Sequence, residues 1–163
     1  MPKAALFMGS KSDFASLEGC VRVLKSFGID TTVRVASAHR TPQVVAEFAA
    51  GARANGYEVI LAAAGKAAHL AGVIAGHTTL PVIGIPVKSS FMDGLDSLLS
   101  TVQMPTGIPV ATVAVGGGEN AACLAAQILS IKYPELAEKL GAHREKMAAS
   151  IEADDAQIAA ELG

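Results

Sequence analysis

Short apolar runs recur along the chain, separated by segments in which apolar residues follow a helical spacing. The runs are too short for helices of ordinary length and are rich in β-branched and small residues, which favours buried strands. Five buried strands are predicted: Ala4–Met8, Thr31–Val35, Val59–Ala64, Pro81–Val87 and Val110–Val115.

The intervening segments place apolar residues three and four positions apart, as amphipathic helices do. Five helices are predicted: Ser12–Phe27, Pro42–Asn55, Ala67–Gly76, Asp93–Val102 and Glu119–Ile131. Regular alternation of strands and helices favours a parallel sheet covered on both faces. The predicted fold is therefore a three-layer α/β/α arrangement of the flavodoxin-like or Rossmann-like type.

Glycine and proline mark several of the predicted boundaries. Gly28 is suited to end the first helix, Thr41 and Pro42 to begin the second with proline at its first position, and Gly56 to end that helix. From Pro134 the chain is rich in Ala, Glu and Lys and no strand follows, which predicts one or two amphipathic helices. We expect a single domain over residues 1–163, with residues 133–163 forming a helical extension that packs on neighbouring subunits.

Composition narrows the class of partner. Apolar residues make up 51% of the 163 residues and charged residues 17%, which is ample for a folded core. The net charge of −2, without a block of Lys or Arg, argues against nucleic acid or acidic lipid and favours a small-molecule ligand. No segment suits a membrane span or a signal peptide, so we expect a cytoplasmic protein, in which Cys20 and Cys123 are buried, reduced thiols.

The loop after the first predicted strand contains Gly9, Ser10, Ser12 and Asp13. Small residues let a ligand approach the backbone, and the following helix offers free amides, so this loop is a candidate cradle for phosphate and ribose. The alternative is that Ser12 or Asp13 only caps the helix. Both roles are compatible.

The loop after the second strand contains Ser37, Ala38, His39 and Arg40. A guanidinium is suited to binding phosphate, and an imidazole is suited to moving protons near neutral pH. A lone loop histidine can equally be a structural or surface residue, and the local sequence leaves both interpretations open.

The loop after the third strand combines small residues with a lysine and a histidine. Lys66 is suited to attract an anion such as a carboxylate, whereas His69 either orients another group or is satisfied within the core. The candidate residues here are Ala64, Gly65, Lys66, Ala67, His69 and Leu70.

Several common site types are absent from the sequence. The GxxxxGK[ST] motif is missing, and Gly116, Gly117 and Gly118 do not follow GxGxxG spacing, so ATP hydrolysis and NAD chemistry lose their main support. No Ser/His/Asp order, carboxylate pair or metal-binding cluster is evident either. Local chemistry alone therefore indicates anion binding.

Four strings, read together, extend this interpretation: MGSKSD, SAHRTP, GKAAHLAG and GLDSLLSTVQMPTGIPV. In order and spacing they resemble the small-subunit family of phosphoribosylaminoimidazole carboxylases over about residues 4–132. One branch of this family converts N5-carboxyaminoimidazole ribonucleotide to its 4-carboxy isomer, and the other joins free CO2 to aminoimidazole ribonucleotide. SAHRTP, AAHL and VQMP resemble the mutase branch, although Lys66 and Ala71 replace a glycine and a proline of its GGAAHLPG pattern.

The resemblance implies roles for the candidate residues. His39 would be the acid and base, and Ser10, Ser12, Asp13 and Arg40 would hold the ribose phosphate. The imidazole and carboxylate would lie against residues 37–39 and 64–70. The family mechanism needs no metal or organic cofactor, and it passes CO2 from nitrogen to carbon within a closed pocket. The resemblance also implies a homo-octamer, in which residues 93–105 complete a neighbour's site, and coupling to an ATP-dependent N5-carboxylating synthetase.

Three other interpretations predict different observations. A flavodoxin-like flavoprotein has little support in a chain with no Trp and 4% aromatic residues. A non-catalytic nucleotide-binding module on the same scaffold would bind ribonucleotide without turnover. An impaired mutase, altered at Lys66, would keep the phosphate site and lose carboxyl transfer.

Overall fold

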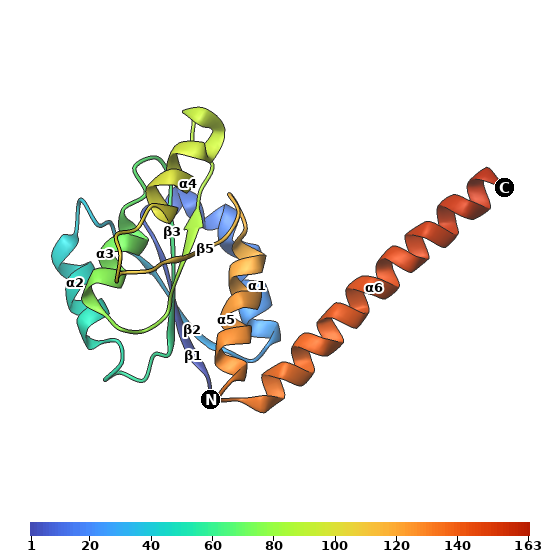
Figure 1. The fold of residues 1–163 in the computed structure, drawn as a ribbon, viewed down its shortest axis with the longest axis horizontal. Helices are drawn as coiled ribbons and strands as arrows, with labels where there is room; N and C mark the ends of the chain where they lie inside the picture. Colours follow the sequence, from blue (N-terminus) through green and yellow to red (C-terminus); the bar gives the residue numbers. More distant parts are fainter.

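A computed structural model describes residues 1–163 and contains one five-stranded parallel sheet (Figure 1). The strand order is β2-β1-β3-β4-β5, which is the flavodoxin-like order. The strands are β1 (Lys3–Met8), β2 (Asp30–Val35), β3 (Val59–Ala64), β4 (Val82–Pro86) and β5 (Ala111–Thr112). The predicted parallel sheet is confirmed.

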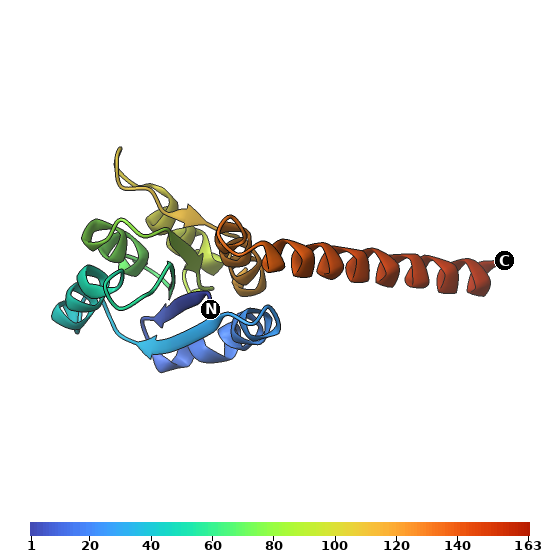
Figure 2. The same ribbon diagram turned by 90° about the horizontal axis from the view of Figure 1, so that it is seen from below.

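Helices cover both faces of the sheet (Figures 1 and 2). On one face α1 packs beside α5, and on the other α2 packs beside α3, with α4 against β4 and β5. The helices are α1 (Phe14–Ser26), α2 (Pro42–Gly51), α3 (Leu70–His77), α4 (Leu95–Val102), α5 (Gly118–Ser130) and α6 (Pro134–Leu162). Two short 3-10 turns, η1 (Lys11–Asp13) and η2 (Met92–Gly94), precede α1 and α4.

The core has two parts because successive side chains of a strand point to opposite faces of the sheet. In β1, Ala4, Leu6 and Met8 join the cluster under α1 and α5, whereas Ala5 and Phe7 join the cluster under α2 and α3. All five side chains are fully or almost fully buried. A continuous apolar run is therefore what a central parallel strand requires.

The boundary signals predicted at Gly28 and Pro42 hold, and the one predicted at Gly56 does not. Gly28 has φ +76°, and the Ile29 amide donates to Leu24 O, which closes the C-terminal motif of α1. Pro42 begins α2 as predicted, but α2 ends at Gly51, and Gly56, with φ +80°, ends the turns that follow the helix. The predicted helix at residues 67–76 begins three residues later, because Ala67–His69 form tight turns before α3.

Two of the five strands are not buried, contrary to the prediction. β2 is the outer strand beside β1, with Val33 and Val35 exposed, and β5 at the opposite edge is only two residues long. An outer strand has a neighbour on one side only, so an apolar sequence there does not ensure burial within one chain.

The C-terminal extension is one continuous helix of 29 residues. Figures 1 and 2 both show α6 leaving the layered body and running away from it to the C-terminus. Only Leu136, in its first turn, is buried. None of the helices is both long and apolar enough to cross a membrane.

Candidate active site

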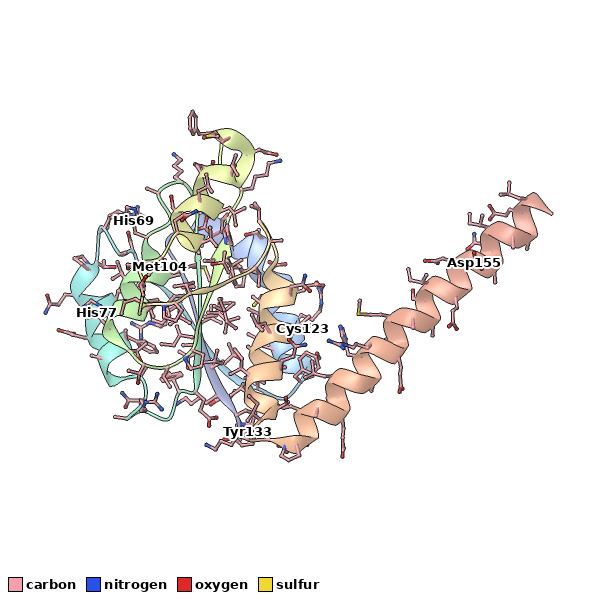
Figure 3. All side chains as sticks on the ribbon, in the orientation of Figure 1. His69, His77, Met104, Cys123, Tyr133 and Asp155 are labelled. Atoms are coloured by element: carbon pink, nitrogen blue, oxygen red, sulfur yellow. The ribbon has the colours of Figure 1, made fainter.

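A cleft lies where the first four parallel strands end. It has a volume of about 550 Å³ and is formed by the loops that follow β1, β2, β3 and β4. Figure 3 shows His69 at this end of the sheet, far from Tyr133 beside the N-terminus. In open α/β sheets, ligands bind outside the carboxyl ends of the strands.

All fourteen candidate residues from the sequence line this one cleft. They are Gly9, Ser10, Ser12, Asp13, Ser37, Ala38, His39, Arg40, Ala64, Gly65, Lys66, Ala67, His69 and Leu70. Sequence reasoning missed four further lining residues, Val87, Lys88, Ser89 and Ser90. Their position directly after β4 was the available signal, since the other three loops were found by the same criterion.

The β1 loop is held together by its serines. Ser10 Oγ accepts hydrogen bonds from the Ser12 amide at 3.3 Å and from Ser12 Oγ at 2.9 Å, so Ser10 caps the short turn η1. Asp13 occupies the N-cap position of α1 but makes no side-chain capping bond. Helix capping therefore does not account for the Ser12 or Asp13 side chains, both of which line the cleft.

Asp13 is a perturbed carboxyl group. Burial raises the pKa of Asp13 above its ordinary value, while the Ser10 backbone, the Ser12 side chain and the Arg40 charge act in the opposite direction. Its carboxylate is thus poorly solvated but has donors nearby, which suits it to accept hydrogen bonds from ligand hydroxyl groups.

The β2 loop is a closed hydrogen-bonded turn between Ser37 and Thr41. Thr41 Oγ1 accepts from the Ser37 amide at 2.9 Å, and Ser37 Oγ accepts from the Arg40 amide at 3.1 Å. Arg40 Nη2 then reaches across to Gly9 O at 2.9 Å. This contact ties the β2 loop to the β1 loop and fixes the guanidinium over the cleft beside Asp13.

The two cleft histidines form a pair. His39 Nε2 lies 2.8 Å from His69 Nδ1, and the rings meet edge to face with centroids 4.9 Å apart. At this distance one nitrogen must donate and the other accept, so a single proton is shared between them. Both side chains are exposed, so His69 is not a buried core histidine.

The β3 and β4 loops contribute two lysines and unusual backbone conformations. Lys66 has φ +54°, in the left-handed region that favours glycine. Lys88 Nζ forms an ion pair with Asp93 at 2.9 Å, and Asp93 is itself left-handed, with φ +55°. Ser89 Oγ binds both carboxylate oxygens of Asp96, at 2.8 and 2.9 Å, which anchors the β4 loop to α4.

The arrangement combines anion binding with proton transfer. Arg40 and Lys66 supply positive charge, the β1 loop supplies hydroxyl groups, and the histidine pair supplies a proton donor and acceptor near neutral pH. No group of three or more His, Cys, Asp or Glu side chains is arranged to bind a metal ion.

Comparison with known proteins gives a consistent result. The family model described as AIR carboxylase matches residues 3–150. A Saccharolobus solfataricus protein named N5-carboxyaminoimidazole ribonucleotide mutase is 56% identical, covering 90% of this chain and 93% of its own length. A Mycobacterium tuberculosis protein of the same name is 47% identical, covering 96% of this chain and 90% of its own.

Among solved structures, the crystal structure of Treponema denticola PurE superposes with a TM-score of 0.87 at 32% identity. The match covers 96% of this chain and 98% of that chain. The similarity therefore includes the helical extension as well as the layered body.

Proposed function

Because the chain belongs to the AIR carboxylase family, we propose that it is an N5-carboxyaminoimidazole ribonucleotide mutase. The reaction moves the carboxyl group from the exocyclic N5 to ring C4 and yields 4-carboxy-5-aminoimidazole ribonucleotide, an intermediate of purine biosynthesis. The observation that carries the proposal is the His39–His69 pair in a cleft that also holds anion-binding side chains. Identities of 47–56% to relatives named as mutases favour this branch over the carboxylase that uses free CO2.

The β1 loop and Arg40 are suited to hold the ribose phosphate. The contact of Arg40 Nη2 with Gly9 O fixes the guanidinium, whose remaining N–H groups can donate to phosphate oxygens. The Ser10 hydroxyl can donate to the same phosphate, and the Ser12 hydroxyl can do so once its proton turns away from Ser10 Oγ. The Asp13 carboxylate can accept from ribose hydroxyl groups. Binding energy at this end would orient the imidazole ring against the β2 and β3 loops.

His39 is proposed to move the proton. It protonates N5 as the N–C bond breaks, and the bonding electron pair remains on nitrogen, which releases neutral CO2. Ring C4 then attacks CO2, and the C4 proton returns to His39 as the new C–C bond forms. One imidazole can serve both steps, because a histidine side chain can both donate and accept a proton.

His69 is proposed to position His39. With His69 Nδ1 at 2.8 Å, the Nε2 edge of His39 has a fixed partner, which restricts both the ring orientation and the tautomer. The small apolar side chains Ala38, Ala64 and Ala67, with Leu70, would surround the released CO2 and limit its escape to water.

The experiment compares the wild type with His39→Asn and His77→Asn. His77 is a matched control, because it is an exposed histidine at the end of α3 whose Nδ1 contacts Val73 O outside the cleft. Conversion of N5-carboxyaminoimidazole ribonucleotide should be retained in His77→Asn and lost in His39→Asn, with ribonucleotide binding intact in both. Wild-type protein that binds ribonucleotide without turnover would contradict the proposal and support a non-catalytic binding module.

We further propose a homo-octamer in the cytoplasm, supplied with substrate by an ATP-dependent N5-carboxylating synthetase. Exposed apolar side chains support assembly: Val33 and Val35 on β2, and Met147, Ile151 and Ile158 along α6. Residues 133–163 would then pack on neighbouring subunits, and residues 93–105 would complete a neighbour's site. Light scattering after gel filtration should give eight times the chain mass of 16.6 kDa, and a monomer would contradict the assembly.

A further inference from the structure

Lys66 is in a backbone conformation that its side chain disfavours. Its φ of +54° lies in the left-handed region, where a Cβ atom crowds the backbone and glycine does not. Two hydrogen bonds, each spanning two residues, come directly after it: the Ala68 amide donates to Lys66 O at 2.9 Å, and the His69 amide donates to Ala67 O at 2.8 Å. Glycine adopts this conformation without strain, so a lysine at this position of the cleft carries a conformational cost.

Lys66 is also the cation of the cleft that lacks a counter-charge. Arg40 interacts with the Asp13 carboxyl and donates to Gly9 O, and Lys88 is paired with Asp93. Lys66 is exposed and has neither an ion pair nor a side-chain hydrogen bond. An unbalanced ammonium group in a binding cleft attracts anions.

The positively charged side chains of Arg40 and Lys66 lie in loops that follow different strands. Arg40 is bound to Gly9 beyond β1, whereas Lys66 follows β3, where Gly65 lies against the backbone of Val87 beyond β4. The amides of Gly65, Lys66 and Ala67 donate to no acceptor in the chain, so the loop that carries Lys66 also has three unpaired N–H groups. A ligand with two separate anionic groups fits this distribution of charge.

We propose that Lys66 holds the carboxyl group during its transfer and thereby discriminates carboxylated from decarboxylated ribonucleotide. This inference rests on the proposed function, whose substrate and product each carry a phosphate and a carboxylate. Arg40 serves the phosphate, and Lys66 with its neighbouring amides serves the carboxylate.

The charge of Lys66 acts at two points of the reaction. While the carboxyl group is on N5 or C4 it is an anion, and the ammonium group stabilises it; as CO2 it is neutral and gains little. The lysine therefore slows the initial loss of CO2 and favours its recombination with C4 over its escape. Removing the charge should increase the share of turnovers that release aminoimidazole ribonucleotide.

The test is a pair of binding measurements by calorimetry, with 4-carboxy-5-aminoimidazole ribonucleotide and with 5-aminoimidazole ribonucleotide. Lys66→Gln removes the charge and keeps a long side chain, and Lys66→Gly also relieves the left-handed strain. Both variants should weaken binding of the carboxylated ligand by roughly 10- to 100-fold, the range for loss of a hydrogen bond to a charged group. Binding of the decarboxylated ligand should change less than about twofold.

Two comparison variants make the result specific. Arg40→Gln should weaken both ligands to a similar extent, because both carry the phosphate. Lys25→Gln, an exposed lysine in the last turn of α1, should change neither. The inference is overturned if Lys66→Gln weakens both ligands equally or leaves both unchanged.

Two measurements separate this inference from the proposed function: turnover by the wild type, and the difference in how Lys66→Gln affects binding of the two ligands, here called the binding split. If the wild type converts the substrate normally and Lys66→Gln shows no binding split, the inference about Lys66 is wrong and the proposed function is unaffected. A wild type without turnover whose Lys66→Gln variant still shows the split would refute the function and retain Lys66 as the carboxylate-binding residue.

Discussion

Removing the His69 imidazole tests whether His39 depends on its partner for orientation. His69→Leu deletes the nitrogen that lies 2.8 Å from His39 Nε2, whereas His69→Asn keeps a hydrogen-bonding atom close to that position. The Leu variant should have a much lower kcat and a KM close to that of the wild type. The Asn variant should recover most of the lost rate.

The size of the effect follows from the contact and its exposure. A hydrogen bond to a charged group contributes about 1.5–3 kcal/mol. Both imidazoles are exposed, so water replaces part of the lost contact, and the lower half of that range applies. Since about 1.4 kcal/mol corresponds to a tenfold change in rate, kcat should fall roughly 10- to 40-fold.

Steady-state kinetics provides the assay, because it measures kcat and KM separately for the wild type and for each His69 variant. An Asn variant as inactive as the Leu variant would refute the positioning role and point to direct chemistry by His69. A Leu variant within twofold of the wild type would show that His39 needs no partner.

Three further predictions concern the scaffold and the perturbed groups. A Cβ at Gly84 would clash with Cγ2 of the buried Thr101, so Gly84→Ala should lower the free energy of unfolding in urea by roughly 1–3 kcal/mol. A Cβ at Gly76 would meet no other atom, so Gly76→Ala should cause no such loss. If Gly84→Ala/Thr101→Ser recovers no stability, the assigned clash is wrong. Burial raises the pKa of Asp13, so the folded chain holds this proton more tightly and loses stability as pH rises from the ordinary carboxyl value to the raised one. Asp13→Asn should therefore unfold at higher urea concentration at pH 7, with a gain that vanishes in acid and a weaker affinity for ribonucleotide; a less stable variant at pH 7 would contradict this. Burial also raises the pKa of Cys20 to about 12, so its thiol should resist disulfide reagents at pH 8 until the chain unfolds, and its contribution to stability should be lost as pH rises from 9 toward 12. Immediate reaction of both thiols in native protein would rule out that environment.

Much of the fold was predictable because local signals and the sheet agree. Continuous apolar strands such as Val59–Ala64 need cover on both faces, and the predicted helices supply it. Burial was predicted wrongly for β2, because residue type does not show which strand lies at the edge of a sheet. Burial was also predicted wrongly for Cys123 on α5, which is only partly buried although its neighbours in the sequence are apolar.

The composition of the candidate site was predictable to a similar degree, but its geometry was not. Loops after strands could be found one by one, and all fourteen candidate residues line one cleft. The contact between His39 and His69 joins residues 30 positions apart and depends on the order β2-β1-β3, which local sequence does not specify. Lysine itself gives no signal for the left-handed conformation of Lys66, and the one indication in the sequence was that Lys66 replaces a glycine of the GGAAHLPG pattern.

In the proposed reaction the carboxyl group stays in the cleft while it moves from N5 to C4. The most direct test of this retention supplies the wild type with N5-carboxyaminoimidazole ribonucleotide labelled with ¹³C in the carboxyl group, in the presence of excess unlabelled bicarbonate. Mass spectrometry of the 4-carboxy product should find the label retained. A product that carries unlabelled carboxyl groups, or that forms from aminoimidazole ribonucleotide only when bicarbonate is added, would contradict the mutase assignment and identify a carboxylase that uses free CO2.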